Sequence, residues 1–389
     1  MITITAKQNC TGCHACSSVC RHNSITMVSD NEGFLYPVVN MEKCVDCGMC
    51  ESVCPVMHGK ESVHKIQAYG CRINNMSIRM DSSSGGVFSL LATEIIARHG
   101  VVFGAGFDEV FHVHHNFTME LEGLSEFRGS KYVQSEIGNV YQKAEAFLKQ
   151  GGPVLFSGTP CQIAGLRAYL QQDYSNLFCM DLICHGVPSP SVWEKYINFR
   201  EAEAGSKVKQ ISFRRKNLGW KLYSLSFLYE DNKRYSKPVT KDMYLQGFLR
   251  NLYLRPSCHA CRFKTISRQS DITLADLWGI QSVLPELDDD KGTSLVLIHT
   301  DKGRDLFDNV EGDMQYKEVE TDSAIRFNSA AVQSCLPSSD REAFFDDLNC
   351  LPLKKVMKKY CKDSIVTSGK NVVRKVCSKI NRTILRKRI

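Results

Sequence analysis

Cysteine spacing constrains the first part of this chain more than any other feature of the sequence. The pattern C-x2-C-x2-C-x3-C occurs twice, as Cys10, Cys13, Cys16 and Cys20 and again as Cys44, Cys47, Cys50 and Cys54. A structural zinc site usually takes two ligands from each of two knuckles, so three cysteines within seven residues, given twice, overfill a tetrahedral site. Residues 1–60 are therefore expected to fold around metal centres that take three thiolates from one tight loop.

This spacing is that of the bacterial two-cluster ferredoxins, in which the fourth cysteine of each run ligates the other cluster. One 4Fe-4S cluster would then take Cys10, Cys13, Cys16 and Cys54, and the other would take Cys44, Cys47, Cys50 and Cys20. Arg21 stands where the first run would often have a proline, which alters a turn but no ligand. Between the runs, FLYPVV at 34–39 predicts a hairpin strand. We expect a small ferredoxin-like α+β domain over residues 1–60.

The cellular compartment follows from cysteine usage and from the absence of export signals in the sequence. Cytosolic thiols stay reduced, so the 18 cysteines indicate metal or redox chemistry rather than a disulfide scaffold. No stretch reaches the roughly 18 uncharged apolar residues that a membrane span needs. The first ten residues, MITITAKQNC, contain neither a basic leader nor a long apolar run. We expect a cytoplasmic protein.

Positive charge is concentrated at the C-terminus. Residues 354–389 contain thirteen Lys or Arg and one acid, Asp363, so they carry +12, and the net charge of +7 leaves −5 for the rest. This split argues against a specific nucleic-acid partner. Apolar residues of the tail fall at helical spacing opposite basic ones, which predicts a basic amphipathic helix that could associate with an anionic inner membrane leaflet. Packing of the same apolar stripe on the body of the protein explains the pattern equally well.

The rest of the chain alternates short apolar strands with amphipathic helices, which predicts a mixed α/β core with some antiparallel pairing. The polar segment GKESVH, which interrupts the apolar pattern after His58, predicts a linker near 58–66. Helices are expected at 86–98, 138–149, 162–171, 190–203 and 241–251, and strands at 101–107, 153–158, 177–184, 211–216, 223–230, 272–278 and 294–300. We divide the chain into a ferredoxin-like domain (1–60), a core (66–300), a C-terminal part of the core (301–353) and a basic tail (354–389).

Six motifs of the core occur together in a recognisable order. They are SSSGGVFS (82–89), RGSKYVQS (128–135), SGTPCQIAGLR (157–167), LICHGVPSP (182–190), CHACRF (258–263) and SDITLADLWG (270–279). With the ferredoxin-like run, residues 1 to about 300 resemble the coenzyme F420 hydrogenase/dehydrogenase beta-subunit family. The resemblance implies a flavin, normally FAD, further iron–sulfur ligation in the core, and electron transfer through the flavin to a hydride-accepting substrate.

Candidate flavin-binding residues lie in three of these motifs. Small residues directly before a helix let backbone amides approach a phosphate, so the resemblance makes residues 82–86 the candidate pyrophosphate loop, although a plain helix cap explains the same letters. Lys131 could place positive charge near the flavin, and Asp276 and Trp278 could lie beside it or form a buried turn. His185 is a candidate for proton delivery. The candidate cofactor-binding residues are thus Ser82, Ser83, Ser84, Gly85, Gly86, Lys131 and Trp278, and the candidate catalytic residues are His185 and Asp276.

A third metal site is predicted in the core. Cys258 and Cys261 form a C-x2-C knuckle, which is half a site. Cys161 and Cys184 each follow a predicted strand, and such loops gather at one edge of an α/β sheet, so the four thiols are expected to hold a third 4Fe-4S cluster. Zinc at the same residues and a reactive Cys161 thiol are the alternatives. The cysteines without partner spacing are expected to be buried small hydrophobes: Cys71, Cys179, Cys335, Cys350, Cys361 and Cys377.

These expectations lead to two functional hypotheses. In the first, the protein is an iron–sulfur, flavin-dependent oxidoreductase that accepts electrons from ferredoxin or another electron-transfer subunit. A hydride then passes from FAD to a small organic or deazaflavin acceptor such as coenzyme F420, because clusters carry one electron whereas such acceptors take two. In the second, the chain is an electron-transfer adaptor that feeds a separate catalytic partner and has no substrate of its own.

Overall fold

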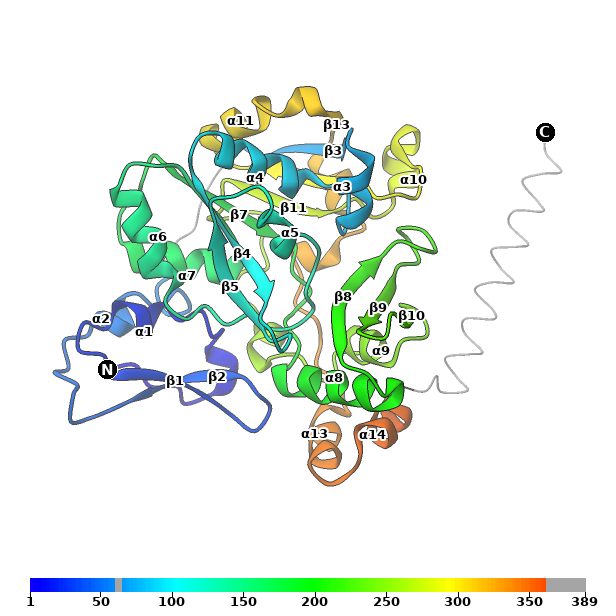
Figure 1. Cartoon of the computed structure of the whole chain (residues 1–389). Helices are drawn as coiled ribbons and strands as arrows, with labels where there is room; N and C mark the ends of the chain where they lie inside the picture. Colours follow the sequence, from blue (N-terminus) through cyan, green and yellow to red (C-terminus); the bar gives the residue numbers. More distant parts are fainter. Residues whose placement is uncertain (60–64, 362–389) are drawn as a thin grey trace.

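The computed structural model describes residues 1–59 and 65–361 of the chain (Figure 1). The predicted linker at 58–66 overlaps residues 60–64, which lie outside this description. The predicted basic tail is described only up to residue 361 and there includes α14 (Leu353–Tyr360), so its remaining residues also lie outside the described ranges. None of the helices in the described ranges combines the length and the apolar composition that crossing a membrane requires.

Within the described residues, the largest sheet has eight strands in the order β13-β3-β12-β11-β7-β6-β4-β5. These strands are β3 (Gln67–Ile73), β4 (Val101–Phe107), β5 (Val113–Thr118), β6 (Val154–Ser157), β7 (Leu177–Leu182), β11 (Ile272–Asp276), β12 (Ser294–Ile298) and β13 (Met314–Val319). Strands β4, β6, β7 and β11 are parallel, and antiparallel pairings add β5 on one side and β12, β3 and β13 on the other. The predicted mixed α/β core is confirmed.

Helices cover both faces of this sheet because successive side chains of a strand point to opposite faces. Val102 packs with α4 (Val87–Ala97), α5 (Leu124–Phe127) and α11 (Asp301–Asp308). Its neighbour Phe103 packs on the other face with α6 (Val140–Lys149) and α7 (Pro160–Leu170). Further along that second face lie α10 (Ile280–Val283) and α12 (Thr321–Ile325). A strand buried on both faces reads as a continuous apolar run, which is why VVFGAGF was recognisable.

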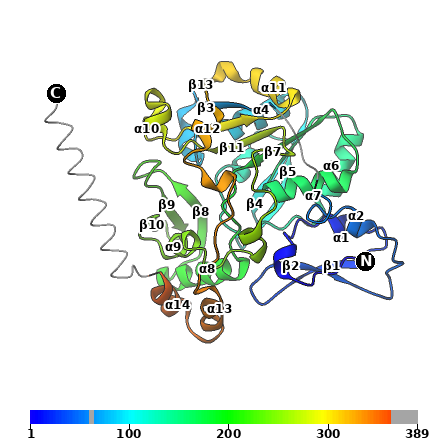
Figure 2. The same ribbon diagram turned by 180° about the vertical axis from the view of Figure 1, so that it is seen from behind.

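A second, smaller sheet forms a separate aromatic core. It consists of β10 (Arg234–Pro238), β9 (Ser224–Tyr229) and β8 (Val208–Arg215), all antiparallel. Helices α8 (Pro190–Ala204), α9 (Met243–Leu249), α13 (Arg341–Cys350) and α14 pack with it around Trp193, Phe213 and Tyr244. Residues 341–360 therefore fold together with residues 190–250, as both views show (Figures 1 and 2).

The N-terminal module is a hairpin with short helices that follow its cysteine loops. Strands β1 (Ile25–Ser29) and β2 (Leu35–Val39) pair antiparallel, so the strand predicted at 34–39 is present. Helices α1 (Ala15–Val19) and α2 (Met49–Ser52) begin inside the two cysteine runs. In both views α1 and α2 lie next to α6 and α7 of the main domain (Figures 1 and 2). The module is thus seated on the core rather than held only by its linker.

The predicted elements between residues 86 and 300 are present, with ends shifted by up to three residues. Strands β3 and β13 and helix α3 (Met76–Asp81) are among the elements that were not predicted. Strand β3 has buried side chains on both faces and a glycine at its centre, so it shows no alternation. Strand β13 is an edge strand with four exposed residues in succession, so its sequence shows no apolar run either.

Candidate cluster-binding and cofactor sites

The second cysteine run lines an open cavity of about 280 Å³ on the N-terminal module. Its thiols are those of Cys20, Cys44, Cys47 and Cys50, which is the set predicted for one cluster. Backbone amides point at two of these sulfurs: the Ser24 N–H donates to Cys20 Sγ at 3.4 Å and the Ile2 N–H to Cys50 Sγ at 3.3 Å. Hydrogen bonds of this kind tune the potential of thiolate-bound clusters. Cys47 is exposed, so this set reaches the surface of the protein.

The other N-terminal set, Cys10, Cys13, Cys16 and Cys54, lies deeper. Burial raises the pKa of the Cys16 thiol, and negative charge on the nearby Cys13, Cys10 and Cys54 raises it further. Burial, together with charge on Cys10 and Cys54, raises the pKa of Cys13 to about 12. These mutual effects show that the crossed fourth cysteine, Cys54, lies with the first run. Such thiols remain protonated at neutral pH until a metal displaces the protons.

The four core cysteines come together, although they are far apart in the sequence. Cys161, Cys184, Cys258 and Cys261 line one cavity of about 30 Å³ with Thr159, His185, Lys264 and Arg268. Cys161 lies in the first turn of α7, Cys184 follows β7, Cys258 lies in the 3-10 helix Pro256–Ala260 and Cys261 follows that helix. The four thiols, and not the volume of the cavity, make this site suitable for a 4Fe-4S cluster. In the part of the chain that the structure describes, no three His, Cys, Asp or Glu side chains are arranged to hold a single metal ion.

Local geometry explains why these cysteines meet. Thr159 caps α7 through a capping box with Gln162, which fixes the first turn and brings Cys161 Sγ within 3.1 Å of Thr159 Oγ1. Gly186 lets the loop after Cys184 approach the knuckle, because a Cβ there would lie 2.9 Å from Leu254 Cδ1 and 3.3 Å from Cys258 Cβ. The next amide, Val187 N–H, donates to Cys258 Sγ at 3.4 Å.

Two cations accompany the core thiols. Burial raises the pKa of Cys184 to about 12, and the positive charges of Lys264 and Arg268 oppose this increase. Lys264 Nζ also donates to the Cys184 carbonyl and, at 2.9 Å, to the Ala330 carbonyl. Four thiolates around a cluster leave net negative charge, so cations at this position suit the donor set.

The first N-terminal set and the core set are neighbours across the module interface. A Cβ at Gly165, one helical turn after Cys161 on α7, would lie 2.9 Å from Cys13 Cβ and 3.1 Å from Cys13 Sγ. Charge on Cys13 also contributes to the raised pKa of Cys161, after burial and the charges on Cys261 and Cys184. The surface set, the buried N-terminal set and the core set therefore lie in succession from the exposed module into the main domain.

The candidate pyrophosphate loop, residues 82–86, connects α3 to α4. Ser82 Oγ donates to the Ile78 carbonyl at 2.7 Å, and Ser84 Oγ donates to the Thr293 carbonyl at 2.9 Å. The Gly85 amide donates to Ser294 Oγ at 2.9 Å. Gly86 caps α4 with a φ of 91°, a conformation that favours glycine. Several of the loop's polar groups are thus already bonded within the protein.

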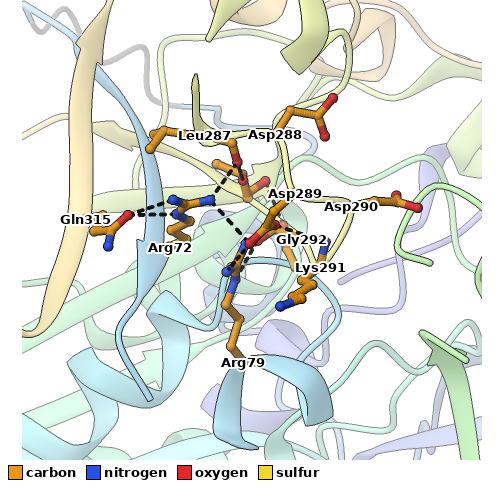
Figure 3. A network of polar contacts seen from close by, with 12 residues as sticks. Arg72, Arg79, Leu287, Asp288, Asp289, Asp290, Lys291, Gly292 and Gln315 are labelled. Carbon is orange, nitrogen blue, oxygen red and sulfur yellow. Dashed lines mark hydrogen bonds and ion pairs between the residues drawn. The ribbon is translucent and has the colours of Figure 1, made fainter. Parts of the chain in front are cut away.

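Arg79, on the helix that precedes this loop, belongs to a polar network with Arg72 and Asp289 (Figure 3). Arg79 pairs with both carboxylate oxygens of Asp289 at 2.8 and 2.6 Å and donates twice to the Gly292 carbonyl. Arg72 Nη1 also lies 3.2 Å from Asp289 Oδ2. Lys216 Nζ donates to the carbonyls of Arg79, Ser84 and Lys291, each at 2.7 Å. These contacts fix the loop against residues 288–292, and no sequence motif indicated a role for Lys216.

Lys131 lies close to the loop but uses its ammonium group locally. Its Nζ donates to the carbonyls of Glu126 at 2.5 Å and Arg128 at 3.3 Å, and burial lowers its pKa to about 7. The adjacent Ser130 joins the two motifs, because Ser130 Oγ lies 2.9 Å from Ser83 Oγ and the Ser130 amide donates to Ser83 Oγ at 2.7 Å. The structure therefore brings the GSKYVQS and SSSGG motifs together.

Asp276 and Trp278 belong to a second cluster of side chains. Arg214 donates to both Asp276 oxygens, at 2.8 and 3.2 Å, and Trp220 Nε1 donates to Oδ1 at 2.8 Å. The Trp220 and Trp278 rings stack with centroids 4.9 Å apart, and Arg214 lies 3.9 Å above the Tyr223 ring. Both carboxylate oxygens of Asp276 are thus engaged. Arg214, which no motif indicated, connects this acid to the aromatic residues.

His185 lies with the core thiols. It lines their cavity, its Nε2 is 2.7 Å from Asn251 Oδ1, and burial lowers its pKa. Cys335, which was expected to be a buried hydrophobe, instead lies half-buried against the same knuckle. Its thiol donates to the Cys258 carbonyl at 3.8 Å, and its own carbonyl lies 3.0 Å from His259 Nδ1. No sequence spacing connects Cys335 with the knuckle.

Two family models match segments of this chain. Residues 152–324 match the family model for the C terminus of the coenzyme F420 hydrogenase/dehydrogenase beta subunit, and residues 9–57 match the 4Fe-4S dicluster domain. A chain from a xenon-derivatized structure of the F420-reducing NiFe hydrogenase complex of Methanosarcina barkeri is 18% identical, with a TM-score of 0.47, covering 77% of this chain and 92% of that one. No curated protein sequence matches the chain. The family models thus match two segments in succession, and the thiol sets lie in these segments: a 4Fe-4S dicluster domain at residues 9–57, and the C-terminal region of the coenzyme F420 hydrogenase/dehydrogenase beta subunit at residues 152–324.

Proposed function

We propose that this protein is an iron–sulfur flavoprotein oxidoreductase. Its two N-terminal clusters would pass single electrons to a third cluster in the core, and FAD would deliver them as a hydride to a small organic or deazaflavin acceptor. The observation that carries the proposal is the contact between the first N-terminal thiol set and α7, where Gly165 faces Cys13 one turn after Cys161. This contact supports a continuous path from the dicluster domain into the core.

The path begins at the surface. Cys47 is exposed and the cavity of its thiol set is open, so a protein electron donor can approach there. The next set, which contains Cys13 and Cys16, is buried, and the core set lies behind it. Each set has the composition that 4Fe-4S ligation requires, and metal binding would release the protons that the raised pKa values of Cys13 and Cys184 retain.

In the proposed flavin site, the chain's contribution is to bind and to orient. The helix N-terminus at Gly86 suits an anionic phosphate, and Lys216 and Arg79 hold the preceding loop in place. When bound, FAD would supply the two-electron chemistry that the clusters lack. Arg214 and Trp278 offer a cation and an aromatic surface for a planar ring or its anion. The buried Trp220 stacks against Trp278, and Asp276 fixes the position of Arg214.

The adaptor hypothesis remains the second candidate, and a specific observation favours it. Ser82 Oγ, Ser84 Oγ and the Gly85 amide bond to the protein's own groups rather than being left available for a phosphate. In that case the chain would transfer electrons to a separate catalytic partner. Peripheral membrane association through the basic tail stays a prediction.

Anaerobic reconstitution tests the proposal. Three clusters correspond to about twelve iron atoms per chain, and stoichiometric FAD should copurify or be taken up. Reduction by a low-potential ferredoxin should then bleach the flavin band. A Cys47→Ser variant should retain FAD and lose fast reduction, because its entry cluster is damaged. A full complement of iron without FAD would favour the adaptor, and a Cys47→Ser protein reduced as fast as the parent would contradict the path.

A further inference from the structure

Arg268 reaches the core thiol cavity from the loop before β11 and is 3% exposed. Among the residues that the structure describes, its Nε and Nη1 atoms have no hydrogen-bond partner. A buried guanidinium with unsatisfied donors is costly unless nearby negative charge compensates it. Two sources of negative charge lie beside Arg268: the core thiols, when they are deprotonated, and the carboxylate of Asp181.

Asp181 pairs with Arg268 but does not line the cavity. Its Oδ2 is 3.6 Å from Arg268 Nη1, and its side chain is almost fully buried on β7, three residues before Cys184. The positive charge of Arg268 lowers the pKa of Asp181 and also that of Cys184. One guanidinium therefore serves as counter-ion to both the carboxylate and the thiol set.

A row of polar side chains continues from Asp181 across the sheet. Thr273 on β11 is the register partner of Asp181 and donates to its Oδ1 at 2.5 Å. The same Thr273 hydroxyl lies 2.8 Å from Nε2 of His299, which follows β12, and 3.3 Å from Ser270 Oγ. Asp181, Thr273 and His299 are each at most 3% exposed. Such a row in the middle of an otherwise apolar sheet needs a reason beyond packing.

We propose that Asp181 takes up a proton when the cluster held by the core thiol set is reduced by one electron, with Arg268 coupling the two events. The inference rests on the core cluster of the proposed function. For each electron that arrives from the N-terminal sets, the carboxylate of Asp181 gains one proton from water and becomes a neutral carboxylic acid. No covalent bond other than the new O–H forms, and the charge of the buried region stays unchanged.

The physical reason is competition for one counter-ion. An added electron makes the thiol side of Arg268 more negative, so the guanidinium neutralises Asp181 less effectively. Repulsion between the two negative charges is strong in a buried, weakly polarisable region, and it favours the protonated acid. Burial already raises the pKa of Asp181 to about 6, against the opposing effects of Arg268, Thr273 and Ser270. A modest further rise moves protonation into the neutral range.

Thr273 gives the proton a route. Its hydroxyl accepts from His299 Nε2–H and donates to Asp181 Oδ1. A His299 ring protonated on both nitrogens can therefore pass its Nε2 proton through Thr273 to Asp181 and is left as the neutral imidazole. Lys264, on the thiol side, adds positive charge near Cys184 and does not contact Asp181 through any hydrogen bond within the described residues. Removal of Asp181 should therefore abolish the coupling without removing a thiol ligand.

The experiment is a redox titration of the holoprotein followed by electron paramagnetic resonance at several pH values. The signal of the core cluster is identified by its loss in a Cys258→Ser variant. If reduction takes up one proton, the midpoint potential of the core cluster should fall by about 59 mV for each pH unit above about 6. This shift corresponds to a tenfold change in the equilibrium constant. The Asp181→Asn variant should show a midpoint independent of pH. A matched control is Asp242→Asn, another buried aspartate whose pKa burial raises, which caps α9 and should retain the slope.

A flat midpoint in the parent protein, or an equal slope in Asp181→Asn, would overturn the inference. If the parent contains no signal that Cys258→Ser removes, the core cluster of the proposed function fails instead. Should Asp181→Asn fail to fold, reduced-minus-oxidised infrared difference spectra of the parent decide the matter. A carboxylic-acid carbonyl band that appears on reduction supports proton uptake, and its absence contradicts it.

Discussion

The guanidinium of Arg255 donates to the backbone carbonyl of Cys10 at 2.8 Å and lies 3.6 Å from the Cys10 thiol. Arg255 is fully buried in the main domain, directly before the 3-10 helix that carries Cys258. It also donates to the Leu35 carbonyl and to Gln134 Oε1, both at 2.9 Å. One side chain thus joins a ligand loop of the dicluster domain to the knuckle of the core site.

Replacing Arg255 by methionine should loosen the N-terminal module from the core. The variant leaves the Cys10 and Leu35 carbonyls without a charged donor, and hydrogen bonds from charged groups contribute about 1.5–3 kcal/mol each. We expect the free energy of unfolding to fall by about 3 kcal/mol and electron transfer into the core to slow. Denaturant unfolding and stopped-flow reduction measure the two effects. Arg262→Met is the control, because the exposed Arg262 makes a single bond to the module, to the Val56 carbonyl. Equal losses in both variants would contradict the special position of Arg255.

Gly165→Ala should disturb the same interface by steric conflict. The new methyl group would lie 2.9 Å from both Cys13 Cβ and Tyr141 Oη, so either the cysteine loop or α7 must shift. Overpacking of this kind costs about 1–3 kcal/mol. Thermal unfolding should show the loss of stability, and iron analysis should show partial loss of the buried N-terminal cluster. Gly312→Ala, where an added Cβ meets nothing within 4 Å, should leave both measurements unchanged.

A comparison of two cysteine variants tests the ligand set of the core. Cys258→Ser should lower the iron content by about four atoms per chain, because a 4Fe-4S cluster that lacks one thiolate is usually lost. Cys335→Ser should retain the iron, since Cys335 packs against the Cys258 carbonyl and does not line the thiol cavity. Unchanged iron in Cys258→Ser would refute the core site. Loss of iron in Cys335→Ser alone would mean that Cys335 replaces one of the four predicted ligands.

Acid should destabilise the fold through His115. This residue is 4% exposed on β5, its Nδ1 lies 2.7 Å from Ser135 Oγ, and burial lowers its pKa to about 4. Because the folded pKa lies below the unfolded value of 6.5, the neutral form stabilises the protein above pH 6.5, and this stabilisation is lost as the pH falls toward 4. Between pH 7 and pH 5 the loss should be about 2 kcal/mol.

The measurement is urea unfolding at both pH values for the parent and for His115→Gln. The variant should lose less stability on acidification, because glutamine keeps a polar side chain without titrating in this range. His114→Gln, on the neighbouring and more exposed position of β5, should behave as the parent does. A parent protein whose stability is the same at pH 5 and pH 7 would contradict the prediction.

Local patterns account for the part of the protein that could be predicted. The two cysteine runs specify their loops because three ligands lie within one short segment, and the structure places Cys54 with the first run and Cys20 with the second. The alternation of apolar strands and helices predicted the main sheet, and the position of Cys161 and Cys184 after parallel strands predicted that they would meet Cys258 and Cys261. Each of these inferences depends on neighbours in the chain or on the polarity of a parallel sheet.

Only the tertiary structure decided which residues surround these sites. Arg255 meets Cys10, Arg214 meets Asp276, Arg268 meets Asp181, and Cys335 meets Cys258 across long stretches of sequence. No spacing encodes such contacts, because the partners come from different elements and meet only when the sheets pack. The sequence by itself determined the thiol loops and the core elements. Packing determined the order of the thiol sets, their counter-ions and their hydrogen bonds, because a buried charge needs a partner wherever the fold places it.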